Sequence, residues 1–303
     1  MSLLARRAEA LGARLPALLV AADRVASTVW QGAHGRRRVG QGDSFWQFRP
    51  FVAGDAASRI DWRQSARSDR HFIRETEWEA AQTVCVWRDA APGMRWRSHQ
   101  APVQKAERAE LLLLALSSLL LRGGERVRLL AVGGRSVSGR TGLGWLADAL
   151  AREAEGDAPG LPPDVPVPRH ARAVLIGDFL SPLDGIRDCL GRFAGTPVRG
   201  QLLQVLDPAE AVLPYEGRVR FEGLAGRGVG DTTLVPRVEQ VRSQYADRLA
   251  AQQDGLAAIC AAAGWGFSVH RTDHPPEAAL LALYAALAPD TARQAGGGPR
   301  GNR

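Results

Sequence analysis

FWQFRPFVAGDAASRIDWRQSAR, residues Phe45–Arg67, combines aromatic, glycine and charged residues just ahead of the first predicted core strand of the chain. Gly54 supplies a position that can adopt positive φ, and the Asp55 side chain can hydrogen-bond to its own backbone in the same turn. Asp61 stands between an isoleucine and a tryptophan, so its carboxylate needs a cation or several N–H donors nearby. The candidate cations are Arg49, Arg59, Arg63 and Arg67.

Two interpretations of this signature stretch, residues 45–67, stay open. In one, it is a set of structural ion pairs that braces an irregular β segment. In the other, it is a surface that binds a partner. The residues that would carry either role are Arg49, Gly54, Asp55, Asp61, Trp62 and Arg67.

The rest of the chain alternates apolar strand-like segments with segments of helical periodicity. This pattern predicts an α/β fold with a doubly wound, mostly parallel sheet, covered by helices on both faces and with ligands at the carboxyl ends of the strands. The expected strands are Thr83–Arg88, Arg126–Val132, Ala171–Asp178, Gly200–Leu206 and Gly266–His270, with a strand pair within Val219–Asp231. The expected helices are Pro102–Arg122, Leu143–Glu155, Leu183–Phe193, Val238–Ala263 and Glu277–Leu287.

Four parts follow from this pattern. Residues 1–35 have apolar side chains at helical spacing and predict an N-terminal helical segment. Residues 36–80 mix glycine, aromatic and charged residues and predict a β-rich region that contains the signature stretch. Residues 81–290 form the α/β domain, and residues 291–303, rich in glycine, predict a disordered tail.

The order of motifs around the signature stretch resembles a bacterial family catalogued as domain of unknown function 58. The motifs are G-x-G-x-x-F, R-x-[FY]-x-x-G-D, R-x-I-D-W and S-A-R, then an acidic strand and an apolar strand that ends in Asp. Here they read Gly40–Phe45, Arg49–Asp55, Arg59–Trp62, Ser65–Arg67 and Glu75–Asp89. The segment Arg271–Glu277 resembles the family's turn after the last strand.

The resemblance implies a von Willebrand factor A-like sheet and a pairing with MoxR-type AAA+ ATPases. We therefore expect a non-catalytic protein-interaction module, an adaptor that works with such an ATPase and a client protein in protein assembly or maturation.

The acids at the strand ends raise the question of a metal ion. Metal-binding von Willebrand factor A domains use D-x-S-x-S after the first strand, because a hard cation binds several oxygen ligands at once. Here the motif reads D-A-A-P-G from Asp89, and Ala91 and Gly93 offer no side-chain oxygen. Asp178 ends a second strand, and Thr141 is a weaker candidate from a third loop. We expect a degenerate site without a cofactor, where Mg²⁺ would depend largely on water for its ligands.

A metal-dependent hydrolase is the alternative, with Asp55, Asp61, Asp89 and Asp178 converging on one cation that activates water. The sequence has no G-K-[ST], G-x-S-x-G or H-E-x-x-H motif that would indicate another catalytic chemistry. We therefore expect no enzyme activity.

Composition bounds the partners and the location. The net charge of +7 is spread along the chain, and only Arg36–Arg38 forms a basic run, so we expect no nucleic-acid partner. No apolar run reaches the length of a membrane-spanning helix, and charges interrupt the N-terminal apolar stretch. We expect a cytoplasmic protein without membrane insertion, with Cys85, Cys189 and Cys260 as reduced core thiols.

Overall fold

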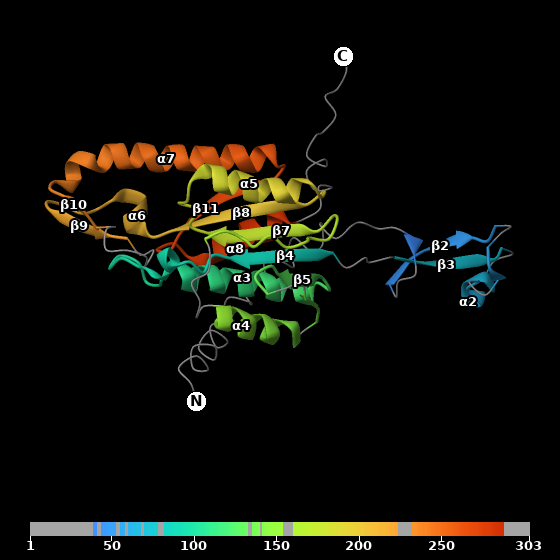
Figure 1. Cartoon of the computed structure of the whole chain (residues 1–303). Coiled ribbons are helices and arrows are strands. Elements are labelled where there is room, and N and C mark those ends of the chain that lie inside the picture. The colour runs from blue at the N-terminus through green and yellow to red at the C-terminus, as the bar shows by residue number, and fades with distance from the viewer. Residues whose placement is uncertain are drawn as a thin grey trace, which may run out of the picture. The chain divides into compact units, whose positions relative to one another are not determined.

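The computed structural model describes residues 39–40, 44–52, 55–57, 60–67, 70–77, 82–132, 135–139, 141–153, 160–223 and 232–287. The chain divides into two compact units, and each is described by itself (Figure 1). The larger includes Gln82–Leu287, and the smaller includes Val29–Ala81. The predicted N-terminal helical segment, the predicted tail and Gly54 lie outside the described residues.

A six-stranded sheet forms the centre of the larger unit, with the strand order β11-β8-β7-β4-β5-β6. All neighbouring strands are parallel except β6, which runs antiparallel to β5. The mostly parallel sheet predicted from the sequence is therefore confirmed. The strands are β4 (Thr83–Arg88), β5 (Arg126–Leu129), β6 (Ser136–Val137), β7 (Arg172–Gly177), β8 (Arg199–Leu206) and β11 (Gly266–Arg271).

The order of strands along the chain reverses between β4 and β7, because the chain first proceeds to β5 and β6 on one side and then returns to β7, β8 and β11 on the other. Such a reversal is the switch point of a doubly wound sheet, where loops at the carboxyl ends diverge and leave room for a ligand. The residues that follow β4 and β7 therefore occupy the place where a site is expected.

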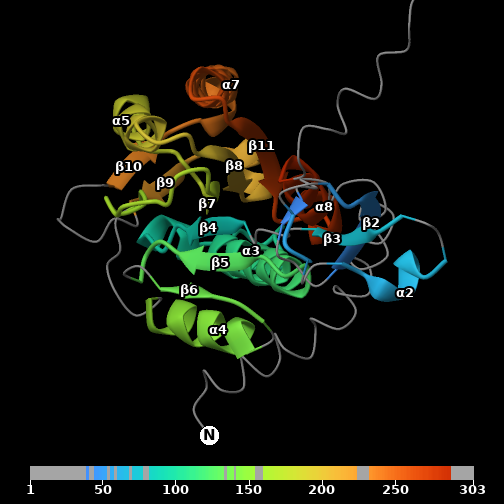
Figure 2. The ribbon, with the colours of Figure 1, turned by 90° about the vertical axis from the view of Figure 1, so that its right-hand side faces the viewer.

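Helices cover both faces of the sheet (Figure 2). One face packs against α3 (Lys105–Arg122), α4 (Thr141–Glu153) and α8 (Pro276–Ala286). The other face packs against α5 (Leu183–Ala194) and α7 (Val238–Ala262). Because each face has its own hydrophobic cluster, the strands between them are buried on both sides and read as continuous apolar runs.

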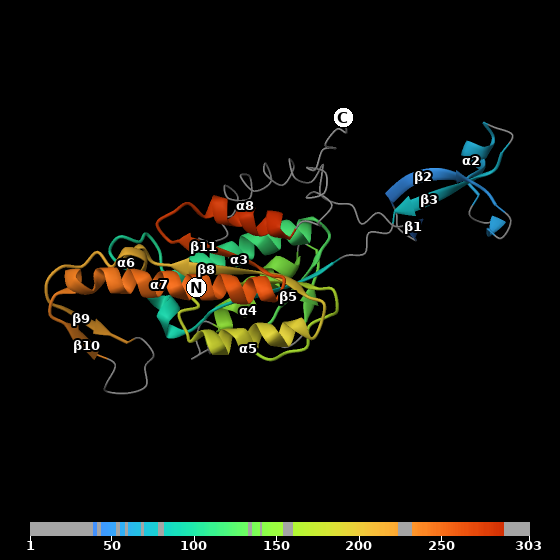
Figure 3. The same cartoon turned by 90° about the horizontal axis from the view of Figure 1, so that it is seen from above.

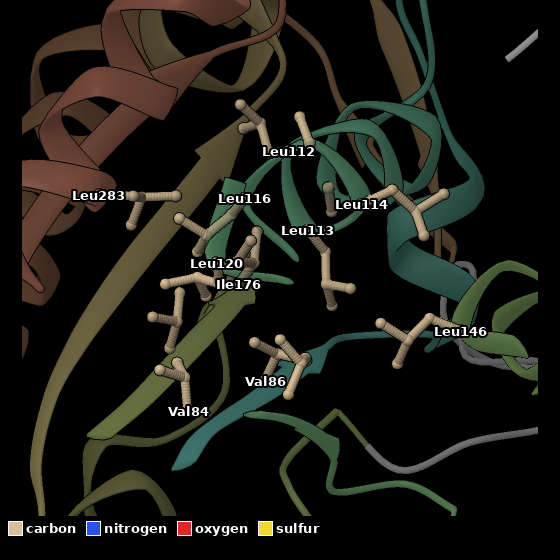
Figure 4. Packing of buried hydrophobic residues seen from close by; sticks show 14 of the residues in the cluster. Val84, Val86, Leu112, Leu113, Leu114, Leu116, Leu120, Leu146, Ile176 and Leu283 are labelled. Carbon is tan, nitrogen blue, oxygen red and sulfur yellow. The ribbon is translucent and has the colours of Figure 1, made fainter. Parts of the chain in front are cut away.

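Helix α3 explains the longest apolar run of the sequence. Its leucines gather over Val84, Val86 and Ile176 of the sheet (Figure 4), and Leu112, Leu113 and Leu116 are fully buried. The run is thus a core helix, as expected. Among the described residues, no helix combines the length and the apolar character needed to cross a membrane.

A short helix and a hairpin between β8 and α7 lie near the carboxyl ends of the strands (Figure 3). Helix α6 (Pro208–Val212) is absent from the predicted elements. An antiparallel strand pair is present, β9 (Val219–Glu222) and β10 (Thr232–Val235), but its second strand lies just after the predicted range Val219–Asp231. The first half of α7 holds this segment, since Arg242 donates to the carbonyls of Leu213 and Tyr215. In addition, the Tyr245 hydroxyl donates to the Glu210 carbonyl.

Two boundaries differ from the predicted ones by three residues, the start of α3 and the end of β5. Helix α3 begins at Lys105, three residues later than expected, because the Glu107 carboxylate accepts from the backbone N–H of Gln104 and closes the helix start there. Strand β5 ends at Leu129, and β6 pairs with its residues Val127 and Arg128.

The smaller unit is β-rich. Its sheet has the order β1-β3-β2, with antiparallel neighbours, and a single-turn helix, α2, lies between β2 and β3. Its elements are β1 (Val39–Gly40), β2 (Ser44–Pro50), α2 (Trp62–Ser65) and β3 (Phe72–Glu77).

Candidate functional site

Asp89 and Asp178 directly follow the neighbouring strands β4 and β7, at the switch point of the sheet. The Asp89 backbone N–H donates to the Ile176 carbonyl at 2.8 Å, so the sheet pairing continues into the first acid. Gly177 permits this approach, because a Cβ atom there would lie 2.9 Å from the Asp89 Cβ. The structure therefore brings these two predicted residues to one edge of the sheet.

A lysine that the sequence reasoning did not single out joins the two acids. The Lys105 Nζ lies 3.0 Å from Asp178 Oδ2 and 2.5 Å from Glu210 Oε1, and its side chain is 1% exposed. Burial opposes the charge of the ammonium, but the two carboxylates outweigh burial and raise the pKa of Lys105 above its usual 10.5. We call Asp89, Lys105, Asp178 and Glu210 the strand-end cluster.

Glu210 reaches the cluster because α6 is firmly capped. Asp207, the residue after β8, is the N-cap of α6, and its Oδ1 accepts from the Ala209 N–H. The Glu210 oxygen that does not contact Lys105, Oε2, accepts from the Asp207 N–H. The second oxygen of Asp207 accepts from the Ser98 N–H at 2.8 Å, which ties the loop before α3 to the end of β8. A capping box thus orients the carboxylate that Lys105 contacts.

The loop that carries Asp178 is held in a strained turn. Phe179 is buried with φ of +48°, a conformation that costs a non-glycine residue free energy. Two glutamines compensate: Gln204 donates to the Asp178 carbonyl at 2.8 Å, and Gln252 donates to the carbonyls of Phe179 and Ser181. These bonds fix the position of the Asp178 carboxylate independently of any ligand.

Asp89 is the most perturbed acid of the strand-end cluster. Burial raises the pKa of Asp89 to about 6, and the neighbouring Asp178 charge adds to the increase. The Ala91 N–H, which donates to Asp89 Oδ1 at 2.8 Å, and the Lys105 ammonium oppose it only in part. Asp89 is therefore poised between its neutral and charged forms in the weakly acidic range.

This shift predicts a stability change with pH. The folded chain holds the Asp89 proton more tightly than the unfolded chain, so the stabilisation is complete below pH 3.8 and is lost as the pH rises through about 6. Asp89→Asn keeps the acceptor for Ala91 and removes the charge. We expect this variant to exceed the wild type in free energy of unfolding by up to about 3 kcal/mol at pH 8, with no difference near pH 4. Urea denaturation across this range measures the difference, and an equal difference at both ends would contradict the assignment.

The residues present do not fit a divalent cation. The Lys105 ammonium already contacts the Asp178 carboxylate, one oxygen of Asp89 accepts a backbone hydrogen bond, and Ala91 and Gly93 provide no side-chain oxygen. Across the described ranges, no three or more His, Cys, Asp or Glu residues are grouped so that they could hold a metal. Thr141 begins α4, after the edge strand β6.

In the signature stretch, Arg49 and Asp55 form a bidentate ion pair. The two guanidinium nitrogens donate to the two carboxylate oxygens at 2.7 and 2.8 Å, and the Val52 N–H donates to the same carboxylate at 3.0 Å. Arg49 is one of the cations named from the sequence, and its carboxylate partner is Asp55. This geometry gives these two residues a structural function in the turn.

Asp61 serves a different local purpose. It is the N-cap of α2, and its Oδ1 accepts from the Gln64 N–H at 2.9 Å. The buried Ser65 hydroxyl donates to the Asp61 carbonyl and accepts from the Phe72 N–H, which joins α2 to β3. The sequence left two options for the Asp61 carboxylate, a cation or N–H donors, and the structure shows a backbone N–H donor.

Trp62 and Arg67 lie on the surface of the smaller unit. Trp62 is 63% exposed, and its ring meets His71 edge-on at a centroid distance of 5.5 Å. Arg67 is exposed, and its backbone N–H donates to the Gln64 carbonyl. Of the predicted residues in this unit, Trp62 is the large apolar side chain that the fold leaves uncovered.

The four acids of the hydrolase alternative are divided between the two units. Asp55 and Asp61 belong to the smaller unit, where each accepts local hydrogen bonds, and Asp89 and Asp178 belong to the larger. Their convergence on one cation stays a prediction without a supporting observation.

The fold and the site define a class of α/β protein: a doubly wound, mostly parallel sheet whose strand-end acids surround a buried lysine. The chain belongs to the family described as Protein of unknown function DUF58, whose profile matches residues 47–255.

Two mycobacterial relatives match most of the chain. They are Uncharacterized protein Rv1480 from Mycobacterium tuberculosis (strain ATCC 25618 / H37Rv) and Uncharacterized protein Mb1516 from Mycobacterium bovis (strain ATCC BAA-935 / AF2122/97). Each is 24% identical over 278 residues, which covers 87% of this chain and 85% of the relative.

Two solved structures show a distant likeness. The conserved hypothetical protein BatB from Bacteroides thetaiotaomicron is 13% identical with a TM-score of 0.38, covering 72% of this chain and 100% of that one. An aerotolerance-related membrane protein from Bacteroides fragilis NCTC 9343 is 13% identical with a TM-score of 0.37, and the match covers 68% of this chain and 98% of that one. Neither likeness is close enough to carry an argument.

Proposed function

We propose that this chain is a non-catalytic protein-interaction module, with a von Willebrand factor A-like larger unit, that acts as an adaptor for a MoxR-type AAA+ ATPase. In this role it recruits a client protein for assembly or maturation in the cytoplasm. The proposal combines the motifs of the signature stretch with one observation on the larger unit, the apolar rim of the strand-end cluster.

The rim consists of two exposed aliphatic residues, each two positions along the chain from an acid that contacts Lys105. Leu180 follows Asp178 by two residues and is 43% exposed, and Val212 follows Glu210 by two residues and is 48% exposed. Exposed aliphatic side chains can contribute to the apolar core of a protein interface. The fixed loops that carry them suit a surface that binds without rearrangement.

The internal ion pairs also support a binding role. Lys105 neutralises Asp178 within the chain, and the Asp178 loop is fixed by glutamine side chains. Such a centre orients neighbouring groups and needs no exchangeable ligand to do so. Exposed Trp62 offers a second contact on the smaller unit, since tryptophan is enriched among residues that dominate binding energy.

Substitution of the rim tests the proposal. We expect Leu180→Asp and Val212→Asp each to weaken binding to the purified MoxR-type ATPase of the same organism by about 10-fold or more, because a charge enters an apolar contact. Leu281→Asp, at an exposed position of α8, serves as the matched control and should leave the affinity unchanged. Biolayer interferometry with the full chain gives the affinities. Absence of wild-type binding, or equal loss in all three variants, would contradict the proposal.

A further inference from the structure

Lys105 is exceptional in the composition of the chain. The sequence contains 39 basic residues, and all of them except Lys105 are arginines. An ammonium is a compact point charge with three donors, whereas a guanidinium is a planar fork that requires a wider space. The one basic residue that could replace a spherical ion is therefore found where Asp178, which follows β7, and Glu210 of α6 meet.

The position of Lys105 in its helix also needs an explanation. It is the first residue of α3, where the helix dipole and the free backbone N–H groups favour an acid and disfavour a cation. The cost is offset by the contacts of its Nζ with Asp178 at 3.0 Å and Glu210 at 2.5 Å. The helix start thus directs a cation into the strand-end cluster, against local preference.

Buried carboxylates that share one site require a cation, and in proteins a divalent metal bound by oxygen ligands often provides it. In this chain the Lys105 ammonium contacts two of the acids and interacts electrostatically with the third, Asp89. We propose that Lys105 is a built-in replacement for a divalent cation, so that the strand-end cluster is complete without metal. The inference concerns the same edge as the proposed function but does not depend on the ATPase partner.

A first experiment uses the wild-type chain. Because Lys105 is the only lysine, selective ¹³C,¹⁵N-lysine labelling gives one side-chain signal by NMR. We expect this signal to keep its intensity as MnCl₂ is added to about 1 mM, a range that would load a weak oxygen site. Selective loss of the signal at lower concentration, abolished by Asp178→Asn, would overturn the proposal because it would place Mn²⁺ within the cluster.

A second experiment removes the Lys105 ammonium from the strand-end cluster. Lys105→Ala leaves Asp178 and Glu210, the two acids that the ammonium contacts, without a counter-charge, so Mn²⁺ should raise the melting temperature of this variant by about 5 °C. The wild type and Lys105→Ala/Asp178→Asn should not respond. A folded Lys105→Ala variant that ignores Mn²⁺ would show that the acids do not surround a cation position. If the variant fails to fold, the wild-type titration alone decides, and neither result depends on partner binding.

Discussion

Lys105→Met should lower the free energy of unfolding by about 3–5 kcal/mol, because it leaves two buried carboxylates without their counter-charge. Methionine matches the length of the four-carbon stem of lysine, so the loss reports mainly on the ammonium and little on packing. Lys105 is 1% exposed, and Asp178 and Glu210 are 16% and 18% exposed, so water can compensate little. Urea denaturation at pH 7 measures the change.

Two controls separate this effect from a general loss of an ion pair. Arg220→Met removes a pair with Glu222 whose side chains are 67% and 62% exposed, and should cost less than about 1 kcal/mol. The triple variant Lys105→Met/Asp178→Asn/Glu210→Gln removes all the charges together and should recover most of the loss. A triple variant as unstable as the single one would show that the ion pairs do not explain the effect.

Arg108→Met should cost about 2–4 kcal/mol, because Arg108 connects α3 to the turn after β11. Arg108 is 6% exposed, and its guanidinium donates to the carbonyls of Thr272 at 3.0 Å and His274 at 2.5 Å. It also contacts the His270 ring at 2.9 Å. Without Arg108, the buried Thr272 carbonyl and the His274 carbonyl lose this donor. This contact gives the C-terminal motif, residues 271–277, a structural role, because it ties the turn after β11 to α3.

The His270 ring provides a second readout for the same variant. Burial lowers the pKa of His270 to about 4, and the Arg108 charge adds to the decrease. In Arg108→Met the pKa should rise part of the way toward 6.5, which an NMR titration detects. Arg271→Met, which removes a partly exposed pair with Asp273, is the matched control and should change stability by less than about 1 kcal/mol. An unchanged pKa of His270 would contradict the assigned contact.

The sheet could be predicted from the sequence because β4 and β7 are buried on both faces and therefore read as unbroken apolar segments. Asp89 and Asp178 directly follow these two strands, and they could be placed at one edge because the carboxyl ends of parallel strands meet there. Helix α6 was missed because it is short, although its start, Asp207 to Glu210, has the spacing of a capping box.

Lys105 could not be assigned to the site because its partners are distant along the chain, at positions 178 and 210. Only the strand order brings them together. The available signal was compositional: a single lysine among arginines, at a helix start that disfavours a cation. In the signature stretch, the two options for Asp61 could not be separated, because an N-cap and a salt-bridged acid look alike when flanked by apolar residues.

The account rests on the position of the Lys105 ammonium among the strand-end acids. A crystal structure of the wild-type chain grown with MnCl₂, with anomalous data at the manganese edge, tests it most directly. We predict Lys105 Nζ within about 3 Å of Asp178, the reach of a charge-assisted hydrogen bond, and no anomalous peak in the cluster. A manganese peak between Asp89 and Asp178, with the lysine side chain turned away, would contradict the account.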